Sequence, residues 1–268
     1  MTITCVRRVS AIAAVTLLSA VAPAFAQTAP SLGSAESYAV LGGSTVTNTG
    51  TSTITGNIGV SPGSSVTGFP PGVVVSGTIH SADASAAGAQ AAVTTAFNAL
   101  GAQPVTQDLS GTNLGGLTLT PGVYVFSSSA QLTGALTLNA LGNPAAVFIF
   151  RTGSTLTTAS GSSVVMIGGG SPCNVYWQIG SSATLGTTTS FAGNILALTS
   201  ITLNTGATIL NGRALARNAA VTLDTNTISA RNCSASIPVP ALSEWAAILL
   251  AVLLAAAGAI ALSRRTAA

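Results

Sequence analysis

Apolar and small polar residues alternate through the middle of the chain, and one short pattern occurs there four times. Each copy is a β-prone triplet followed by a phrase of Ser, Thr, Gly and Ala that ends in a hydrophobic residue. The phrases are Ser128–Leu132, Thr152–Leu156, Ser181–Leu185 and Thr205–Ile209, and the triplet before the last of them is Ile201–Leu203. Their starts are about 24 to 29 residues apart, a range typical of stacked, solenoid-like architectures.

The repeat predicts a mainly β fold, a β-solenoid. One turn of the solenoid cannot bury its aliphatic side alone, so successive turns stack and share a continuous core. The other side of each phrase then presents a row of small hydroxyls. Residues 31–80 also read as short strands with many turns. Exposed ends of a strand stack need covering, and segment 31–80 and the helix described next are the candidates.

One segment between the two chain ends has a helical pattern, at about residues 83–100. It is rich in Ala, and Ala89, Val93, Phe97 and Leu100 share one face. Asp83 or Ser81 can serve as the N-cap, and Gly101 follows as a stop signal. The apolar stripe predicts that this helix packs along another part of the fold.

The N-terminal segment 1–26 is typical of a secretory signal peptide. Arg7 and Arg8 precede an apolar stretch, Val9 to Val21, and Ala24-Phe25-Ala26 has the small-x-small form of a cleavage site. A membrane-spanning anchor is the alternative, but the apolar run is short. We therefore expect the mature protein to begin at Gln27 and its folded domain to cover residues 27–236.

The C-terminal segment, residues 237–268, has a different pattern. Ala246 to Leu262 is an apolar run, which with Trp245 spans about 27 Å as a helix and predicts a membrane-crossing segment. Arg264 and Arg265 follow it and favour retention of that end on the cytoplasmic side. The phrase Val239–Trp245 before this run resembles the bacterial Ile-Pro-Thr-Leu sorting signal, although Ala241 replaces the usual Thr. The resemblance implies an exosortase-like processing protease as a partner and a protein that is extracellular or held at the cell surface, at least transiently.

Charged residues make up only 5% of the chain, which contains no Lys. Residues 27–236 have four Arg and four acidic residues, so their net charge is about zero and they lack the basic face that nucleic-acid binding requires. The acidic residues are scattered, and His80 is the only His, so the composition disfavours an enzyme. A Ser-His-Asp arrangement that uses His80 and Asp83 or Asp108 stays open as a minor alternative. We expect no metal site and no cofactor.

Three cysteines occur, and Cys5 belongs to the signal peptide. Cys173 and Cys233 remain in an exported domain, where the environment permits oxidation. A disulfide between them is the favoured prediction, and two free buried thiols are the alternative.

The exported domain resembles the microbial ice-binding protein family. The similarity extends over residues 32–230 and is carried by motifs such as Tyr38–Gly43, Leu119–Tyr124, Val175–Thr184, Phe191–Ala197 and Val221–Ile228. It implies a right-handed discontinuous β-solenoid with a long helix alongside. It also implies adsorption to the ice and water lattice through Thr-Gly/Ala-x-Thr/Asn phrases on one face, which inhibits ice growth and recrystallisation.

The family motif assigns candidate ice-contacting residues to the four phrases. Thr152 to Thr155 and Thr205 to Thr208 match the motif fully, Ser181 to Thr184 matches it in part, and Ser128 to Gln131 matches it poorly. The candidates are Ser128, Thr152, Ser154, Thr155, Ser181, Thr184, Thr205 and Thr208. The alternative function is a non-catalytic surface adhesin or structural solenoid that binds glycan or another cell.

Overall fold

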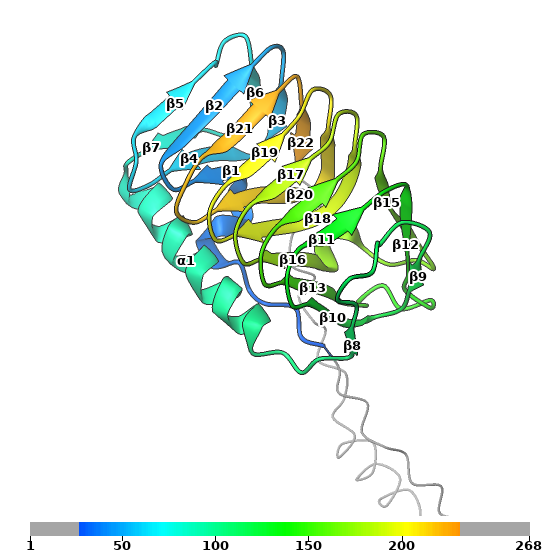
Figure 1. The fold of residues 1–268 in the computed structure, drawn as a ribbon. Coiled ribbons are helices and arrows are strands. Elements are labelled where there is room, and N and C mark those ends of the chain that lie inside the picture. Colours follow the sequence, from blue (N-terminus) through cyan, green and yellow to red (C-terminus); the bar gives the residue numbers. More distant parts are fainter. Residues whose placement is uncertain (1–26, 231–268) are drawn as a thin grey trace, which may run out of the picture.

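The computed structural model describes residues 27–230, and both terminal segments lie outside the described residues. Within residues 27–230, parallel strands form one sheet of 15 strands and one of seven, wound into a stack of coils with a single α-helix alongside (Figure 1). The larger sheet bends where β18 (Ser190–Ala197) and β20 (Thr208–Ala216) pass from one side of the stack to the next. The stack therefore has three faces, and the predicted mainly β fold with stacked turns is confirmed.

The seven-stranded sheet makes the first face, which we call the threonine face. Its strands, in spatial order, are β11 (Ala130–Leu132), β14 (Leu156–Thr158), β17 (Ala183–Leu185), β19 (Ile201–Leu203), β21 (Val221–Asp224), β2 (Thr45–Thr49) and β5 (Ser65–Thr67).

The larger sheet makes the other two faces. The second face consists of β9 (Thr118–Leu119), β12 (Ala135–Asn139), β15 (Ser163–Ile167), the first parts of β18 and β20, β22 (Thr227–Ser229), β3 (Thr53–Thr55) and β6 (Val73–Ser76). The helix face consists of β8 (Gln107–Asp108), β10 (Gly122–Phe126), β13 (Phe148–Thr152), β16 (Val175–Ile179), the last parts of β18 and β20, β1 (Tyr38–Gly42), β4 (Asn57–Val60) and β7 (Ile79–Ser81). Two short 3-10 helices, η1 (Gly33–Ser37) and η2 (Pro172–Asn174), complete the elements.

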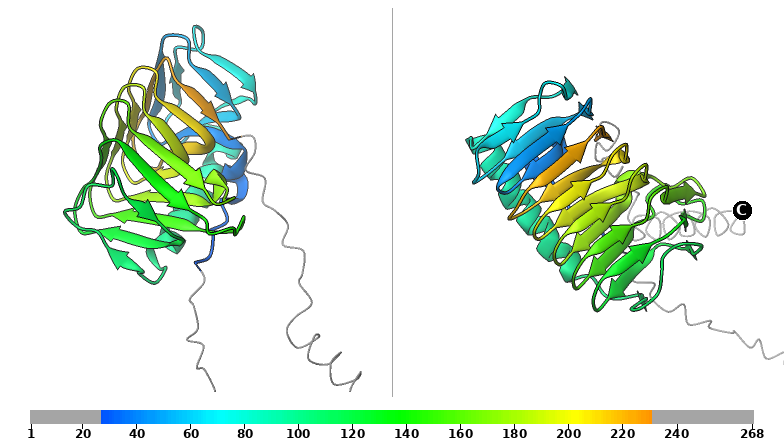
Figure 2. Two further views of the ribbon diagram at one scale, coloured as in Figure 1. Left: turned by 90° about the vertical axis from the view of Figure 1, so that its right-hand side faces the viewer. Right: turned by 45° about the horizontal axis from the view of Figure 1, so that its top comes forward.

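The order of the coils in space differs from their order in the sequence. Strands β1, β2 and β3 pair with β20, β21 and β22, so the N-terminal coils stack on the C-terminal coil. From β7 the chain returns through α1 (Ala84–Gly101) to β8, which lies at the opposite end of the stack (Figures 1 and 2). An 18-residue helix is about 27 Å long, which matches roughly six inter-strand steps of about 4.8 Å.

This arrangement corrects the prediction that segment 31–80 and the helix cover the ends of the stack, and it confirms that the helix packs along another part of the fold. Segment 31–80 does not act as a separate cover, because β1 to β7 extend the stack and become its end. The helix lies along the side of the stack rather than over an end, as its apolar stripe predicted. Its small residues, such as Ala89 and Ala96, are fully buried and bring the helix backbone close to Tyr38, Leu41 and Leu196.

Asp83 is the N-cap of α1, as predicted. One oxygen of its carboxylate, Oδ1, accepts a hydrogen bond from the Ala86 amide at 2.8 Å, and Oδ2 contacts His80 Nδ1 at 2.8 Å. His80 and Asp83 are two of the residues that the sequence left open as part of a Ser-His-Asp arrangement. In the structure, this pair stabilises the start of the helix.

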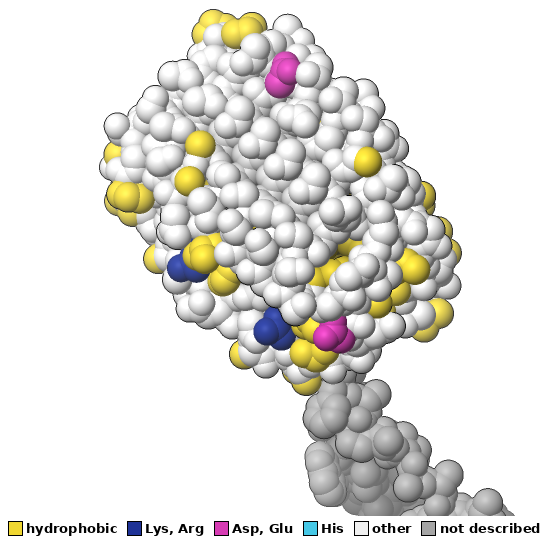
Figure 3. Space-filling model, in the orientation of Figure 1, with side chains coloured by type: hydrophobic (Ala, Val, Ile, Leu, Met, Phe, Trp, Pro, Cys, Tyr) yellow, Lys and Arg dark blue, Asp and Glu magenta, His cyan; other side chains and the backbone are white. Residues whose placement is uncertain are grey.

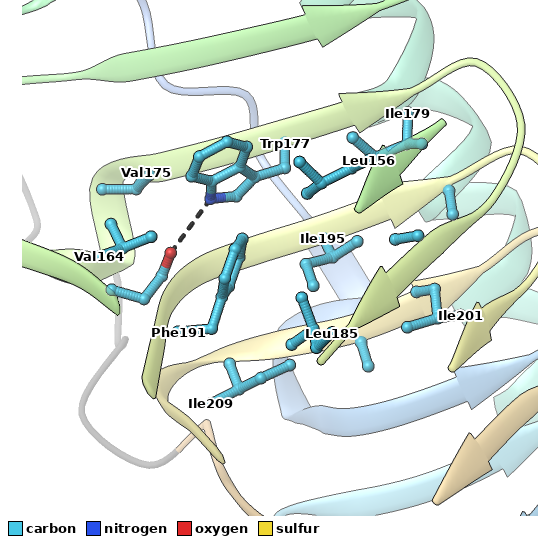
Figure 4. Packing of buried hydrophobic residues seen from close by; sticks show 14 of the residues in the cluster. Leu156, Val164, Val175, Trp177, Ile179, Leu185, Phe191, Ile195, Ile201 and Ile209 are labelled. Carbon is cyan, nitrogen blue, oxygen red and sulfur yellow. Dashed lines mark hydrogen bonds between the residues drawn. The ribbon is translucent and has the colours of Figure 1, made fainter. Parts of the chain in front are cut away.

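A ladder of aromatic rings fills one end of the core. The Phe150 and Trp177 rings stack at a centroid distance of 4.0 Å. The Phe191 ring follows at 4.9 Å from the Trp177 ring (Figure 4). The Trp177 indole Nε1–H donates to the Ala192 carbonyl at 3.1 Å, so its one polar atom is satisfied inside the core. Stacked aromatic rings and aliphatic residues of successive coils make the solenoid interior continuous.

The fourth predicted repeat is out of register with the other three. The repeat predicts that Ile201–Leu203 is equivalent to triplets that lie on the helix face, but β19 pairs with β17 on the threonine face. The cause is β18, which runs through a bend at Gly193 and so spans two faces with one strand. Gly193 has φ +102°, and a Cβ there would lie 2.7 Å from Val175 Cβ, so no larger residue fits.

A buried cation fastens η1 to the stack. The Arg213 guanidinium donates to Asn194 Oδ1 at 2.7 Å and to the Glu36 carbonyl at 2.7 Å. Burial lowers the pKa of Arg213, and the nearby Glu36 charge counteracts that effect.

None of the helices within residues 27–230 combines the length and the hydropathy that a transmembrane helix requires. The predicted signal peptide 1–26 and the predicted spanning segment 246–262 lie outside the described residues.

Candidate functional site

Six threonines form a single row across the threonine face. Each occupies the outward position of its strand, and the register joins them in one line from coil to coil. The row runs Gln131, Thr157, Thr184, Thr202, Thr222, Thr47 and Thr67, so only its first position is not a threonine.

A second row of hydroxyls runs beside the first, two positions earlier in each strand. Ladder hydrogen bonds and side-chain contacts align its members, and Thr155 Oγ1 donates to Ser129 Oγ at 2.8 Å while Ser200 Oγ donates to Ser182 Oγ at 2.9 Å. The row consists of Ser129, Thr155, Ser182, Ser200, Ala220, Thr45 and Ser65. Together the two rows make a grid whose repeat is about 4.8 Å between strands and about 6.8 Å along a strand.

The grid is held rigid from below. Between the two rows, the inward residues Leu156, Ile201 and Val221 are fully buried in the core. Threonine itself has a β-branched side chain with few rotamers, so each hydroxyl and methyl keeps a defined direction. The side chains are therefore ordered before any partner arrives.

The grid has no ionisable group. Figure 3 shows this side of the molecule as a nearly continuous area of uncharged polar side chains and backbone, with charged side chains only towards its borders. Asp224, at the end of β21, accepts hydrogen bonds from the hydroxyls of Thr205 and Thr225. A surface of hydroxyls, methyls and one amide can hydrogen-bond water and exclude it locally, but it holds no nucleophile paired with a base.

The structure places the eight predicted contact residues on different parts of the molecule. Thr184 lies in the threonine row and Thr155 in the adjacent hydroxyl row. Ser128, Ser154 and Ser181 lie in the turn that leads into this sheet, where their backbones hydrogen-bond in sequence from coil to coil. These five residues therefore lie on the grid or at its border.

The remaining three predicted residues do not join the same ladder. Thr152 is only 6% exposed and its hydroxyl donates to the Ser154 carbonyl at 3.1 Å, so the expectation of an outward side chain is wrong. Thr208 begins β20 and pairs with Ser190 and Thr227 on the second face. Thr205 is exposed in the turn after β19, beyond the far border of the grid.

The sequence motif did not identify five members of the threonine row: Thr157, Thr202, Thr222, Thr47 and Thr67. The signal that could have found them is a shorter phrase, a hydrophobic residue followed by Thr, with a small residue two positions before that Thr. It occurs in β14, β17, β19, β21, β2 and β5. The longer period of the predicted repeat hid it, because Thr184, Thr202 and Thr222 follow one another at a shorter spacing.

Two other predicted features can be located. Cys173 in η2 is disulfide-bonded, whereas its predicted partner Cys233 lies outside the described residues, so that pairing stays a prediction. Across residues 27–230, no cluster of three or more His, Cys, Asp or Glu side chains could hold a metal ion.

The sequence matches two family models. Residues 40–229 match the family described as ice-binding-like, and residues 237–265 match the IPTL-CTERM motif. An ice-binding protein of Nostoc sp. (strain HG1) is 64% identical over 198 residues, which cover 74% of this chain and 73% of that protein. An ice-binding protein of Flavobacterium frigoris (strain PS1) is 34% identical over 213 residues, covering 74% and 75%.

Solved structures show the same similarity. The crystal structure of an ice-binding protein from an Antarctic biological consortium superposes with a TM-score of 0.73 at 51% identity, covering 76% of this chain and 92% of the other. That of an ice-binding protein from the Antarctic ascomycete Antarctomyces psychrotrophicus gives a TM-score of 0.73 at 41% identity, covering 76% and 100%.

Proposed function

Because this chain belongs to the ice-binding-like family, we propose that it adsorbs to ice through the threonine face and so inhibits ice growth and recrystallisation. The observation that carries the choice of face is the row of six threonines in register, within a grid that contains no ionisable side chain. The family is one of non-catalytic proteins, and the grid offers no reactive group.

Adsorption follows from the chemistry of the grid. Each threonine supplies a hydroxyl that bonds a water molecule and a methyl that disfavours disordered water beside it. Each contact is weak, but the grid repeats at the inter-strand spacing of the sheet, so many contacts form together without much loss of side-chain entropy. An ordered layer of water on such a surface can merge with the crystal, whereas a charged or mobile surface would disturb that layer.

The test is a tyrosine substitution in the middle of the row, assayed in the fragment 27–236. Solved relatives of matching extent support the use of this domain alone. Thr202→Tyr places a ring above the grid and separates its neighbours from ice, so we expect thermal hysteresis to fall by an order of magnitude or more.

Thr208→Tyr is the matched control, since it adds the same ring to the neighbouring strand β20 on the second face. We expect it to keep ice shaping and recrystallisation inhibition. Equal loss in both variants, or none in Thr202→Tyr, would place the ice contact elsewhere. A wild-type fragment that does not shape ice would favour the adhesin alternative.

We also propose that the protein is exported and held at the membrane by its C-terminal segment, at least until processing. The IPTL-CTERM match, the apolar run 246–262 and the following Arg264 and Arg265 support this location. An exosortase-like protease is the candidate partner that would cut the segment.

Cell fractionation tests the location. The full chain should sediment with membranes, and a chain ending at residue 236 should be released to the medium or the periplasm. Arg264→Ala together with Arg265→Ala is a milder change that should weaken retention without altering the folded domain. Release of the full chain at the same rate as the truncated chain would refute membrane anchoring.

A further inference from the structure

Large apolar side chains are exposed on one side of the solenoid. Among the described residues, the threonine face carries none of them, whereas the second face and the turn after β12 carry six. The six are Val73, Val75, Leu141, Val165, Ile167 and Leu210, and the two others are Val105 and Ile79.

Four of these residues form what we call the apolar patch. Leu141, Val165, Ile167 and Leu210 are 67%, 41%, 43% and 49% exposed. Pairing of Ser163 with Ser190 and of Ser190 with Thr208 places Val165 and Leu210 in corresponding positions two strands apart, roughly 10 Å. The Ala140 amide donates to the Ile167 carbonyl at 3.0 Å, which brings the Leu141 turn beside β15. The parts of the strands that form the second face contain no charged residue.

The described chain ends beside this patch. Ser229 pairs with Leu210, and Ala230 is the last described residue. Only the short segment 231–245 separates Ala230 from the apolar run that begins at Ala246. Fifteen residues span at most about 50 Å even when fully extended. The patch is therefore tethered near any surface into which the apolar run inserts.

We propose that the apolar patch rests on the lipid surface of the membrane that holds the C-terminal segment, which turns the threonine face away from the lipid towards the surrounding water. This inference rests on the proposed membrane anchoring. A patch of four aliphatic side chains binds weakly alone, but a short tether raises the local concentration of lipid to the millimolar range or above, so a weak contact suffices.

The chemistry of the patch favours lipid over a second protein. It has no Trp, Tyr or Arg, the residues that usually anchor protein interfaces. Leu141, the most exposed of the four, lies in the turn after β12 and not on a strand, and a fluid interface accommodates such an uneven surface more readily than a rigid partner does. The uncharged Thr and Ser residues around the patch can contact polar headgroups.

The test compares two labelled cysteines in the full chain from Gln27 onward, reconstituted in phospholipid nanodiscs. Thr227→Cys lies on β22 of the second face and Thr222→Cys on β21 of the threonine face; both threonines are exposed. Each carries an environment-sensitive fluorophore, and the unsubstituted chain measures background labelling. We expect spin-labelled lipid to quench the label at 227 at least threefold more than the label at 222, and aqueous iodide to do the reverse.

A second variant separates the patch from the tether. Leu210→Ser with Val165→Ser should remove the difference between the labels while the domain keeps its circular dichroism and melting temperature. Equal quenching of the labels at 227 and 222, in chains that keep Leu210 and Val165, would overturn the proposal. Shielding at 227 that depends on protein concentration and not on lipid would also overturn it, in favour of a second copy. Failure of the full chain to co-float with nanodiscs would refute the anchor. Absence of ice shaping by the unlabelled, unsubstituted chain would refute the ice function. Both results differ from equal quenching of the two labels on chains that do co-float, which overturns only the patch proposal.

Discussion

At the scale of single residues, the threonine row combines two chemical groups in one stiff side chain. The Thr47 hydroxyl lies 3.5 Å from the Thr222 hydroxyl, so neighbouring side chains touch without forming strong bonds that would compete with water. The row is thus free to bond a water layer, whereas the shorter contacts of the second row, such as Thr155 to Ser129, hold those side chains in place.

Substitution of Thr202 separates the roles of the methyl and the hydroxyl. Thr202→Val keeps the shape and the β-branch, whereas Thr202→Ser keeps the hydroxyl and loses the rotamer restriction. We expect the serine variant to lose more thermal hysteresis than the valine variant, since rigidity and methyl packing organise the water layer. Nanolitre osmometry on both variants measures this, with Thr208→Ser as control. The reverse order would show that hydrogen bonding by the hydroxyl dominates.

At the scale of elements, the helix and the bends decide how the coils meet. The helix bridges the two ends of the stack, and its start depends on Asp83. The hydrogen bond from the Ala86 amide, followed by that with His80, lowers the pKa of Asp83 below its ordinary value of 3.8. A carboxylate with a lowered folded-state pKa stabilises the fold above the unfolded pKa, and this contribution disappears as the pH falls through the folded pKa.

Asp83→Ala should therefore lower the melting temperature slightly at pH 5 to 7, roughly the range where the carboxylate is charged in both states. The gap from the wild type should shrink at pH values below the folded pKa, because the wild-type cap is then protonated. Thermal melts across this range measure the effect, and ice shaping at neutral pH should be unchanged because α1 does not touch the threonine face. A gap independent of pH would assign the stabilisation to packing alone.

At the scale of the whole molecule, alkaline pH should lower stability without affecting ice adsorption, because the grid contains no ionisable group. Burial raises the pKa of Tyr176, beneath the helix, to about 12 from its ordinary value of 10. Its neutral form stabilises the fold below pH 10, and that contribution is lost as the pH rises towards about 12, at a cost of ~2–3 kcal/mol.

Ice adsorption should accordingly stay constant from about pH 5 to 9, where no Thr or Ser ionises. The free energy of unfolding should begin to fall above about pH 10, the ordinary pKa of tyrosine. Parallel hysteresis and denaturation measurements across this range check both expectations. Tyr176→Phe should remove part of the alkaline loss, and a hysteresis that titrates within the neutral range would point to a charged contact outside the grid.

The sequence by itself determined the class of the fold and the kind of surface. Alternating aliphatic and hydroxyl residues specify strands with one buried side, the Ala-rich segment specifies a helix with Asp83 as its cap, and the scarcity of charge leaves a neutral polar exterior. These are local properties, which depend on side-chain type and spacing along the chain.

Only the tertiary structure decided which hydroxyls share a face. The N-terminal strands stack on the C-terminal coil, so Thr47 and Thr67 extend a row whose other members lie far away in the sequence, on the other side of α1. The bend at Gly193 shortens one coil and moves Thr208 to the second face, although its phrase resembles that of Thr155. The register between strands depends on the number of residues in each bend and on the connection through α1, which joins the two ends of the stack. A repeating phrase in the sequence specifies neither of them.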